Sequence, residues 1–127
     1  MRTITAVLLL LSAFGVRAEW DRVGTSVSGN TFYLDFSTIK KTAVGYRVWE
    51  LVNFTEREYG AYSSKTLWEY DCNEERLRSL QTSELSEPMG EGAVVDGKTS
   101  PSQWHYVEPQ SAGETLLKIV CSRKNRR

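Results

Sequence analysis

The two cysteines constrain this chain more than any other feature, because any disulfide, cysteine metal site or cysteine nucleophile must use one or both of them. Cys72 and Cys121 are the only cysteines, and His105 is the only histidine. A zinc site takes about four ligands, and a cysteine nucleophile needs a base, for which His105 is the only imidazole. In an exported chain, two cysteines most simply form one disulfide. Such a bond would contribute roughly 4 kcal/mol to stability.

The N-terminus predicts export. Arg2 is followed by an apolar run over residues 4–16, and Val16 and Ala18 occupy the −3 and −1 positions before Glu19. This is the layout of a secretory signal peptide and its cleavage site. A transmembrane anchor would need about 20 apolar residues, more than the run provides. We expect a signal peptide over residues 1–18 and a mature domain over residues 19–127, with no cysteine near its start to carry a lipid anchor.

The expected mature chain has a mildly acidic body and a basic tail. It would hold 14 lysines and arginines against 16 aspartates and glutamates, since Arg2 and Arg17 leave with the leader. Four of the basic residues fall in the last five positions. Proteins that bind nucleic acids present a basic face, so we expect no nucleic-acid partner and interpret the tail as a solvated terminus.

The residues around each cysteine predict the element that carries it. Before Cys72 the chain alternates with a period of two, which indicates a half-buried strand. One side of it carries Thr66, Trp68, Tyr70 and Cys72, and the other carries Lys65, Glu69 and Asp71. Ser111 and Glu114 form a capping-box pattern ahead of an apolar run. In the helix that follows, one face would carry Leu116, Leu117, Val120 and Cys121. A disulfide would therefore staple a C-terminal helix to one face of a sheet.

The rest of the chain has the pattern of short strands separated by turns. We expect strands at residues 20–26, 31–36, 45–54 and 103–107. Residues 76–83 are interpreted as a strand rather than a helix, although Leu77 and Leu80 would then fall on opposite faces. Residues 87–102 are rich in Gly, Pro and Ser, and we expect an ordered loop there, either plain or with a short hairpin inside it, and a tight turn at Asp96-Gly97. The fold class is therefore α+β, with a sheet and a C-terminal helix.

The chain resembles the surface-adhesin protein E family of Gram-negative bacteria over nearly all of the expected mature domain. The resemblance is carried by six stretches in the family's order: FYLDFSTI, YRVWELVNF, LWEYDCNEERLRSLQT, PMGEGAVV, PSQW and GETLLKIVC. It implies a single antiparallel sheet of about six strands. It also implies that a Cys72–Cys121 disulfide tethers the C-terminal helix to the concave face.

The resemblance further implies a function in binding. Family members are surface adhesins that bind host matrix and serum proteins and can dimerise through the sheet, with contacts that map to residues 62–82 here. Lys65, Arg76 and Arg78 are the exposed-looking cations of that region. Trp49 and Trp104 are candidate aromatic anchors. We therefore expect an adhesin-like protein-binding module with a host matrix or envelope protein as partner, and a homodimer as a second assembly. The chain lacks the lipidated cysteine of those adhesins, so we expect the periplasm rather than the surface.

Two other classes of function are open to an exported chain of this kind: small-ligand binding and catalysis. The alternative binding function is a soluble periplasmic domain that holds a small ligand in an apolar cavity between sheet and helix. An enzyme would need a constellation of catalytic groups, and no motif places a carboxylate pair in a cleft. Residues 89–92 also lack the spacing of a nucleotide-binding loop. We expect a protein that is not an enzyme, with no catalytic residues, no metal and no cofactor.

Overall fold

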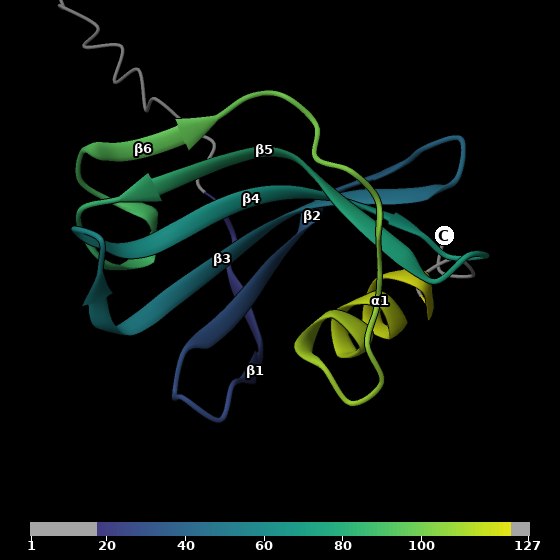
Figure 1. The fold of residues 1–127 in the computed structure, drawn as a ribbon, viewed down its shortest axis with the longest axis horizontal. Helices are drawn as coiled ribbons and strands as arrows, with labels where there is room; N and C mark the ends of the chain where they lie inside the picture. Colours follow the sequence, from purple (N-terminus) through teal and green to yellow (C-terminus); the bar gives the residue numbers. More distant parts are fainter. Residues whose placement is uncertain (1–17, 123–127) are drawn as a thin grey trace, which may run out of the picture.

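The computed structural model describes residues 18–122, which form one curved antiparallel sheet and one α-helix (Figure 1). Six strands lie side by side in sequence order, each antiparallel to the next. They are β1 (Asp21–Thr25), β2 (Thr31–Lys41), β3 (Gly45–Glu58), β4 (Ala61–Asp71), β5 (Arg76–Leu85) and β6 (Val94–Lys98). A two-residue strand, β7 (His105–Tyr106), pairs with the start of β5. The expected α+β fold with a single antiparallel sheet is confirmed.

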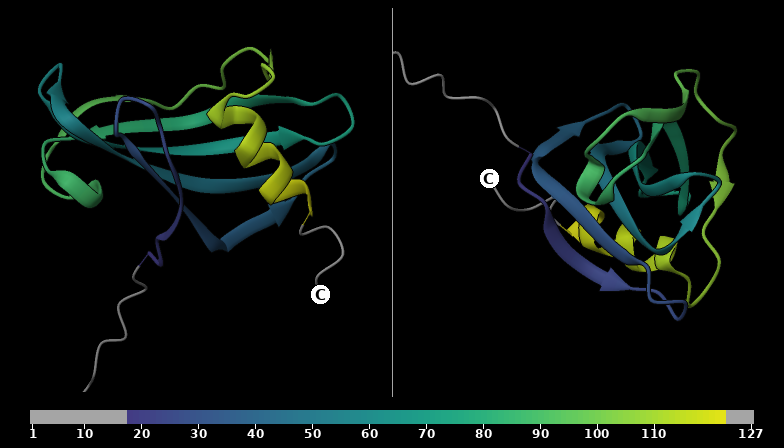
Figure 2. Two further views of the ribbon diagram at one scale, coloured as in Figure 1. Left: turned by 90° about the horizontal axis from the view of Figure 1, so that it is seen from below. Right: turned by 90° about the vertical axis from the view of Figure 1, so that its left-hand side faces the viewer.

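The helix α1 (Ala112–Ser122) lies across one face of the sheet, which we call the helix face (Figure 2). Alternation along the strands brings apolar side chains to this face, and the helix adds its own apolar stripe. The resulting buried cluster consists of Leu34, Val48, Tyr70, Leu116, Leu117 and Val120. Each aliphatic side chain of this cluster contributes about 1.5–3 kcal/mol through burial. The helix is therefore held mainly by the packing of Leu116, Leu117 and Val120 against the sheet.

The predicted helix start is confirmed in its main part. The Glu114 N–H donates to the Ser111 Oγ at 3.2 Å, which is the N-cap bond. The second bond of a capping box, from the Ser111 N–H to the Glu114 side chain, is not made. Instead, the Ser111 N–H donates to the Glu108 carbonyl at 3.3 Å, and the Glu114 carboxylate accepts from the Lys118 Nζ at 3.2 Å.

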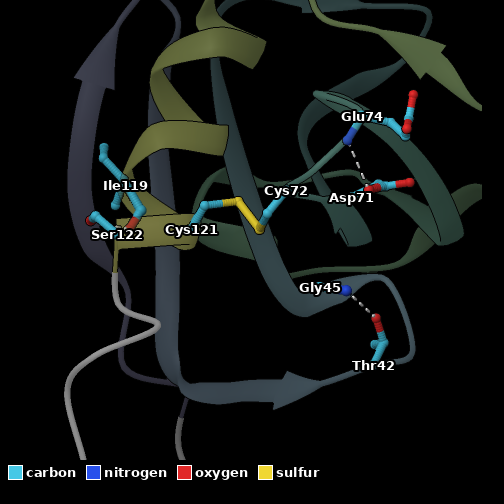
Figure 3. Close-up of a disulfide and its surroundings, with 8 residues drawn as sticks. All are labelled: Thr42, Gly45, Asp71, Cys72, Glu74, Ile119, Cys121 and Ser122. Carbon is cyan, nitrogen blue, oxygen red and sulfur yellow. Dashed lines mark hydrogen bonds between the residues drawn. A yellow bond between two sulfur atoms is a disulfide. The ribbon is translucent and has the colours of Figure 1, made fainter.

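The Cys72–Cys121 disulfide joins the end of β4 to the last turn of α1, as predicted (Figure 3). The two Cα atoms are 5.8 Å apart. Tight backbone packing surrounds Cys72: a Cβ atom at Gly45 would collide with the Tyr70 carbonyl oxygen, so only glycine fits at the start of β3. The turn after β4 is fixed by the Glu74 N–H, which donates to the Asp71 Oδ1 at 3.1 Å.

The strand predicted at residues 76–83 is confirmed, and it carries a bulge that explains its poor alternation. Leu67 pairs with Gln81, and the next residue, Trp68, pairs with Ser79, so Leu80 is an extra residue in β5. A bulge of this kind shifts the alternation of a strand by one residue. Leu77 and Leu80 are therefore separated by a break in register, which a strict period of two cannot describe.

The tight turn predicted at Asp96-Gly97 is wrong. Both residues lie inside β6, where Gly97 pairs with Ser83 and Asp96 pairs with Glu84. The chain reverses earlier, through the 3-10 turn η1 (Pro88–Gly90), and the Ser86 N–H closes this loop on the Ala93 carbonyl at 2.9 Å. All five residues of β6 are exposed, so this edge strand lacks the apolar alternation by which strands are recognised.

Two predicted segments fall on the ends of the chain. All of the expected signal peptide except Ala18, and the basic tail from residue 123 onward, lie outside the described residues. Within residues 18–122, no helix is both long and apolar enough to cross a membrane.

Candidate binding face

The sheet face opposite α1, which we call the far face, carries most of the polar and aromatic side chains singled out in the sequence. On β4 it is marked by the alternate residues Lys65, Leu67, Glu69 and Asp71, because Trp68 and Tyr70 pack toward the helix. Three separate segments lie over parts of it: the loop containing η1, the N-terminal residues 18–20, and Trp104 before β7.

The η1 loop is bound to the far face through polar side chains. The Ser63 Oγ donates to the Glu87 carbonyl at 2.6 Å and accepts from the Gly90 N–H at 2.9 Å. The Met89 N–H donates to the Asn53 Oδ1 at 2.7 Å. Gly90 has φ +71, and a Cβ atom there would lie 2.9 Å from the Lys65 Cδ. The loop therefore fixes one wall beside Lys65, and glycine is required for that approach.

Beside this loop, the far face is hollowed around Lys65. One hollow of about 330 Å³ is lined by Ala18, Trp20, Asp35, Thr38, Trp49, Lys65, Gln81 and Ser83. A second, of about 440 Å³, shares Ala18, Trp20 and Lys65 with it and extends to the η1 loop. Lys65 takes part in none of the ion pairs among residues 18–122. An ammonium group in a hollow that is also lined by two tryptophans can receive an anionic or acceptor-rich group.

The other predicted residues of this face form a second cluster, near the start of β5. The Arg76 Nε lies 2.9 Å from the Asp71 Oδ2, and the Arg78 Nη2 lies 2.8 Å from the Glu69 Oε1. Both guanidinium groups stack on the Trp104 ring, at 4.6 and 4.5 Å from its centre. Burial opposes the charged form of Asp71, but hydrogen bonds from the Glu74 N–H and from Arg76 outweigh it and lower the pKa of Asp71.

Replacing Trp104 with alanine is expected to reduce stability by about 2 kcal/mol, because two cation–π contacts and a half-buried ring are lost together. Urea unfolding followed by tryptophan fluorescence measures the change. Tyr106→Ala is the matched control: Tyr106 is a neighbouring exposed aromatic residue, and its removal should change the free energy of unfolding by less than about 0.5 kcal/mol. An equal decrease in the free energy of unfolding in the two variants would show that the contacts of Trp104 with Arg76 and Arg78 do not stabilise the domain.

The five candidate binding residues thus separate into two groups on one face. Trp49 and Lys65 line the hollow, whereas Arg76, Arg78 and Trp104 form the stacked cluster. The arginines are half-buried, with 28% and 32% of their side chains exposed, and both are paired with buried carboxylates. They are therefore not free cations. Sequence reasoning missed Trp20 and did not predict that Asp35 is buried, since both depend on the position of the N-terminal segment on the sheet.

The helix face carries one unusual polar group and little open space. Burial raises the pKa of Glu50 to about 7, against a hydrogen bond that the Trp68 Nε1–H donates to its Oε1 at 3.0 Å. Burial, reinforced by the charge of Glu50, raises the pKa of Tyr70 well above its usual value. The hollow between β1, β2 and α1 is only about 80 Å³. Nowhere in residues 18–122 do three or more His, Cys, Asp or Glu side chains gather as metal ligands.

Residues 18–122 define a class: an antiparallel one-sheet domain with an α-helix tethered by a disulfide to one side of the sheet, and polar and aromatic residues on the other side. The chain belongs to the surface-adhesin protein E family, whose sequence model matches residues 20–122. That membership supports an adhesin-like protein of the cell envelope.

Solved structures of Haemophilus influenzae protein E share the fold. One, crystal form II, has a TM-score of 0.68 at 18% identity and covers 86% of this chain and 91% of that one. Another, protein E from non-typeable Haemophilus influenzae, has a TM-score of 0.65 at 18% identity, covering 87% of this chain and 80% of that one. At this identity the likeness concerns the fold. A search of curated protein sequences finds no match.

Proposed function

We propose that this chain is an exported, non-enzymatic protein-binding module of the bacterial envelope, and that it binds through the far face. The observation that carries the proposal is the family match across residues 20–122. The far face supports it, because tryptophans such as Trp49 and Trp104 commonly anchor protein interfaces. Lys65, which has no ion pair among residues 18–122, adds a positive charge that could attract an acidic partner. The partner we propose is a host matrix protein or another envelope protein.

Binding is expected to depend more on the hollow than on Arg76 and Arg78, which are already paired with carboxylates. Trp49→Ala or Lys65→Ala should weaken binding to an immobilised matrix protein roughly tenfold or more, because each removes a central contact of the far face. Surface plasmon resonance measures the affinities. Lys118→Ala removes an exposed ammonium group from α1 and should leave binding unchanged. Equal binding by all three variants would show that the interface does not include the hollow. Light scattering would then test for a homodimer that forms through the sheet.

We also propose that the mature domain resides in the periplasm rather than on the cell surface. Protease shaving of intact cells that make the native chain, with a periplasmic marker to exclude leakage, is expected to leave the domain intact. Opening the outer membrane should then allow its digestion. Digestion on intact cells would overturn the periplasmic location and favour contact with host proteins.

A second candidate function, the binding of a small ligand, is favoured by the size of the far-face hollow. Ligand pockets commonly measure about 300–1,000 Å³, and the hollow around Trp49 is about 330 Å³. The space between sheet and helix, where we expected such a ligand, is only about 80 Å³. Equilibrium dialysis with anionic small molecules tests this candidate, and it fails if Trp49→Ala leaves their uptake unchanged.

A further inference from the structure

Asp35 is a buried carboxylate with neutral hydrogen-bond partners. Its side chain belongs to the far face, and the residue is only 3% exposed. The Oδ1 accepts from the Ser37 N–H at 3.1 Å and from the Ser37 Oγ at 2.5 Å. The Oδ2 accepts from the Glu19 N–H at 3.2 Å. None of the ion pairs among residues 18–122 includes Asp35.

Other buried carboxylates on the same face have a cation beside them. Asp71 is paired with Arg76, and Glu69 with Arg78. Burying a carboxylate without a counter-charge is costly. Among residues 18–122 no ion pair supplies a counter-charge to Asp35, and Lys65, which lines the same hollow, is not paired with it. The group that does reach its Oδ2 is the backbone nitrogen of Glu19.

Glu19 is the residue that follows the expected cleavage site. Hydrolysis of the Ala18–Glu19 peptide bond consumes one water, leaves a carboxylate on Ala18, and turns the Glu19 nitrogen into an α-ammonium group. The cleavage therefore places a positive charge on the atom that already donates to Asp35. A hydrogen bond between charged groups is stronger than its neutral counterpart.

We propose that Asp35 is the binding site for the N-terminal ammonium group of the mature chain. Cleavage after Ala18 would then place a positive charge beside this buried carboxylate. The same cleavage also removes Ala18, which lines both hollows of the far face. Processing would thus anchor Glu19 and widen access to Trp20, Trp49 and Lys65 in one step. The proposal rests on the expected signal cleavage and does not depend on which partner the far face binds.

The test compares two chains with defined N-termini, one starting at Glu19 and one at Ala18. The longer chain keeps a neutral Glu19 amide and moves the ammonium group one residue away. The Glu19 chain is expected to have a folding equilibrium constant roughly tenfold larger, the difference between a charged and a neutral hydrogen bond. Asp35→Asn should abolish this difference, whereas Asp21→Asn, which removes an exposed carboxylate from β1, should preserve it.

Two results would overturn the proposal. One is equal stability of the two chains, or a difference that survives Asp35→Asn. The other is an intact mass showing that cells release the native chain with an N-terminus other than Glu19. If Asp35→Asn does not fold, the comparison of the two unmutated chains together with the mass still decides the question. Neither readout uses partner binding, so a failure of the binding function would not affect the result.

Discussion

Replacing both Cys72 and Cys121 with alanine is expected to lower the free energy of unfolding by about 4 kcal/mol, because the bond closes a loop across a sequence separation of 49 residues. The loss should be centred on α1. That helix has 11 residues, too few to be stable alone in water. Without its tether, it relies only on the apolar cluster formed by Leu116, Leu117 and Val120 with the sheet.

Chemical denaturation under oxidising and reducing conditions measures this effect. The oxidised native chain should be the most stable form, and its reduced form should match the double alanine variant. The double variant should not respond to the reductant, which controls for other effects of the reagent. If oxidised and reduced native chains unfold at the same denaturant concentration, the disulfide does not stabilise the domain and α1 is held by packing alone.

Glu50→Gln is expected to stabilise the domain at alkaline pH and to have little effect at acid pH. The pKa of Glu50 is about 7 in the folded chain against an ordinary 4.5, so the folded state keeps its proton after the unfolded state has lost it. Stability is therefore lost as the pH rises from about 4.5 through about 7, by a total of about 3 kcal/mol. Glutamine removes the buried charge and can still accept from the Trp68 Nε1–H.

Thermal unfolding of both chains between pH 4.5 and pH 8 measures this difference. The native chain should lose stability over that interval relative to Glu50→Gln, and the gap should be largest at pH 8. Glu58→Gln provides a matched control, since it removes an exposed carboxylate from the same strand and should follow the native pH profile. A constant gap between native and Glu50→Gln chains across the interval would show that Glu50 does not carry its raised pKa.

The parts of the fold that could be predicted are those set by neighbouring residues. Alternation before Cys72 located the second half of β4, and the Ser111 cap located the start of α1, because strand and helix periods depend on residues only a few positions apart. The disulfide followed from having a single pair of cysteines. The bulge at Leu80 could not be predicted, because it appears only when β5 is paired with β4.

The candidate site was less predictable because segments distant in sequence build it. Arg76 and Arg78 look like solvated strand cations until Trp104, from the segment before β7, stacks on both of them. Asp35 would lie on a solvated face if residues 18–20 did not cross the sheet there. The positions on the far face were therefore predictable. Which charges form ion pairs was not, since tertiary packing decides that Lys65 makes none within the described part of the chain.

The disulfide also determines how the domain would carry a mechanical load. Tension applied between Glu19 and the C-terminal end would reach Cys121 and pass through the sulfur–sulfur bond to Cys72, directly after β4. The strands β5 to β7 and most of α1 lie within the covalent loop, so they cannot be drawn out while that bond is intact. Only β1 to β4 could unravel, which limits how far the domain can lengthen when it is pulled.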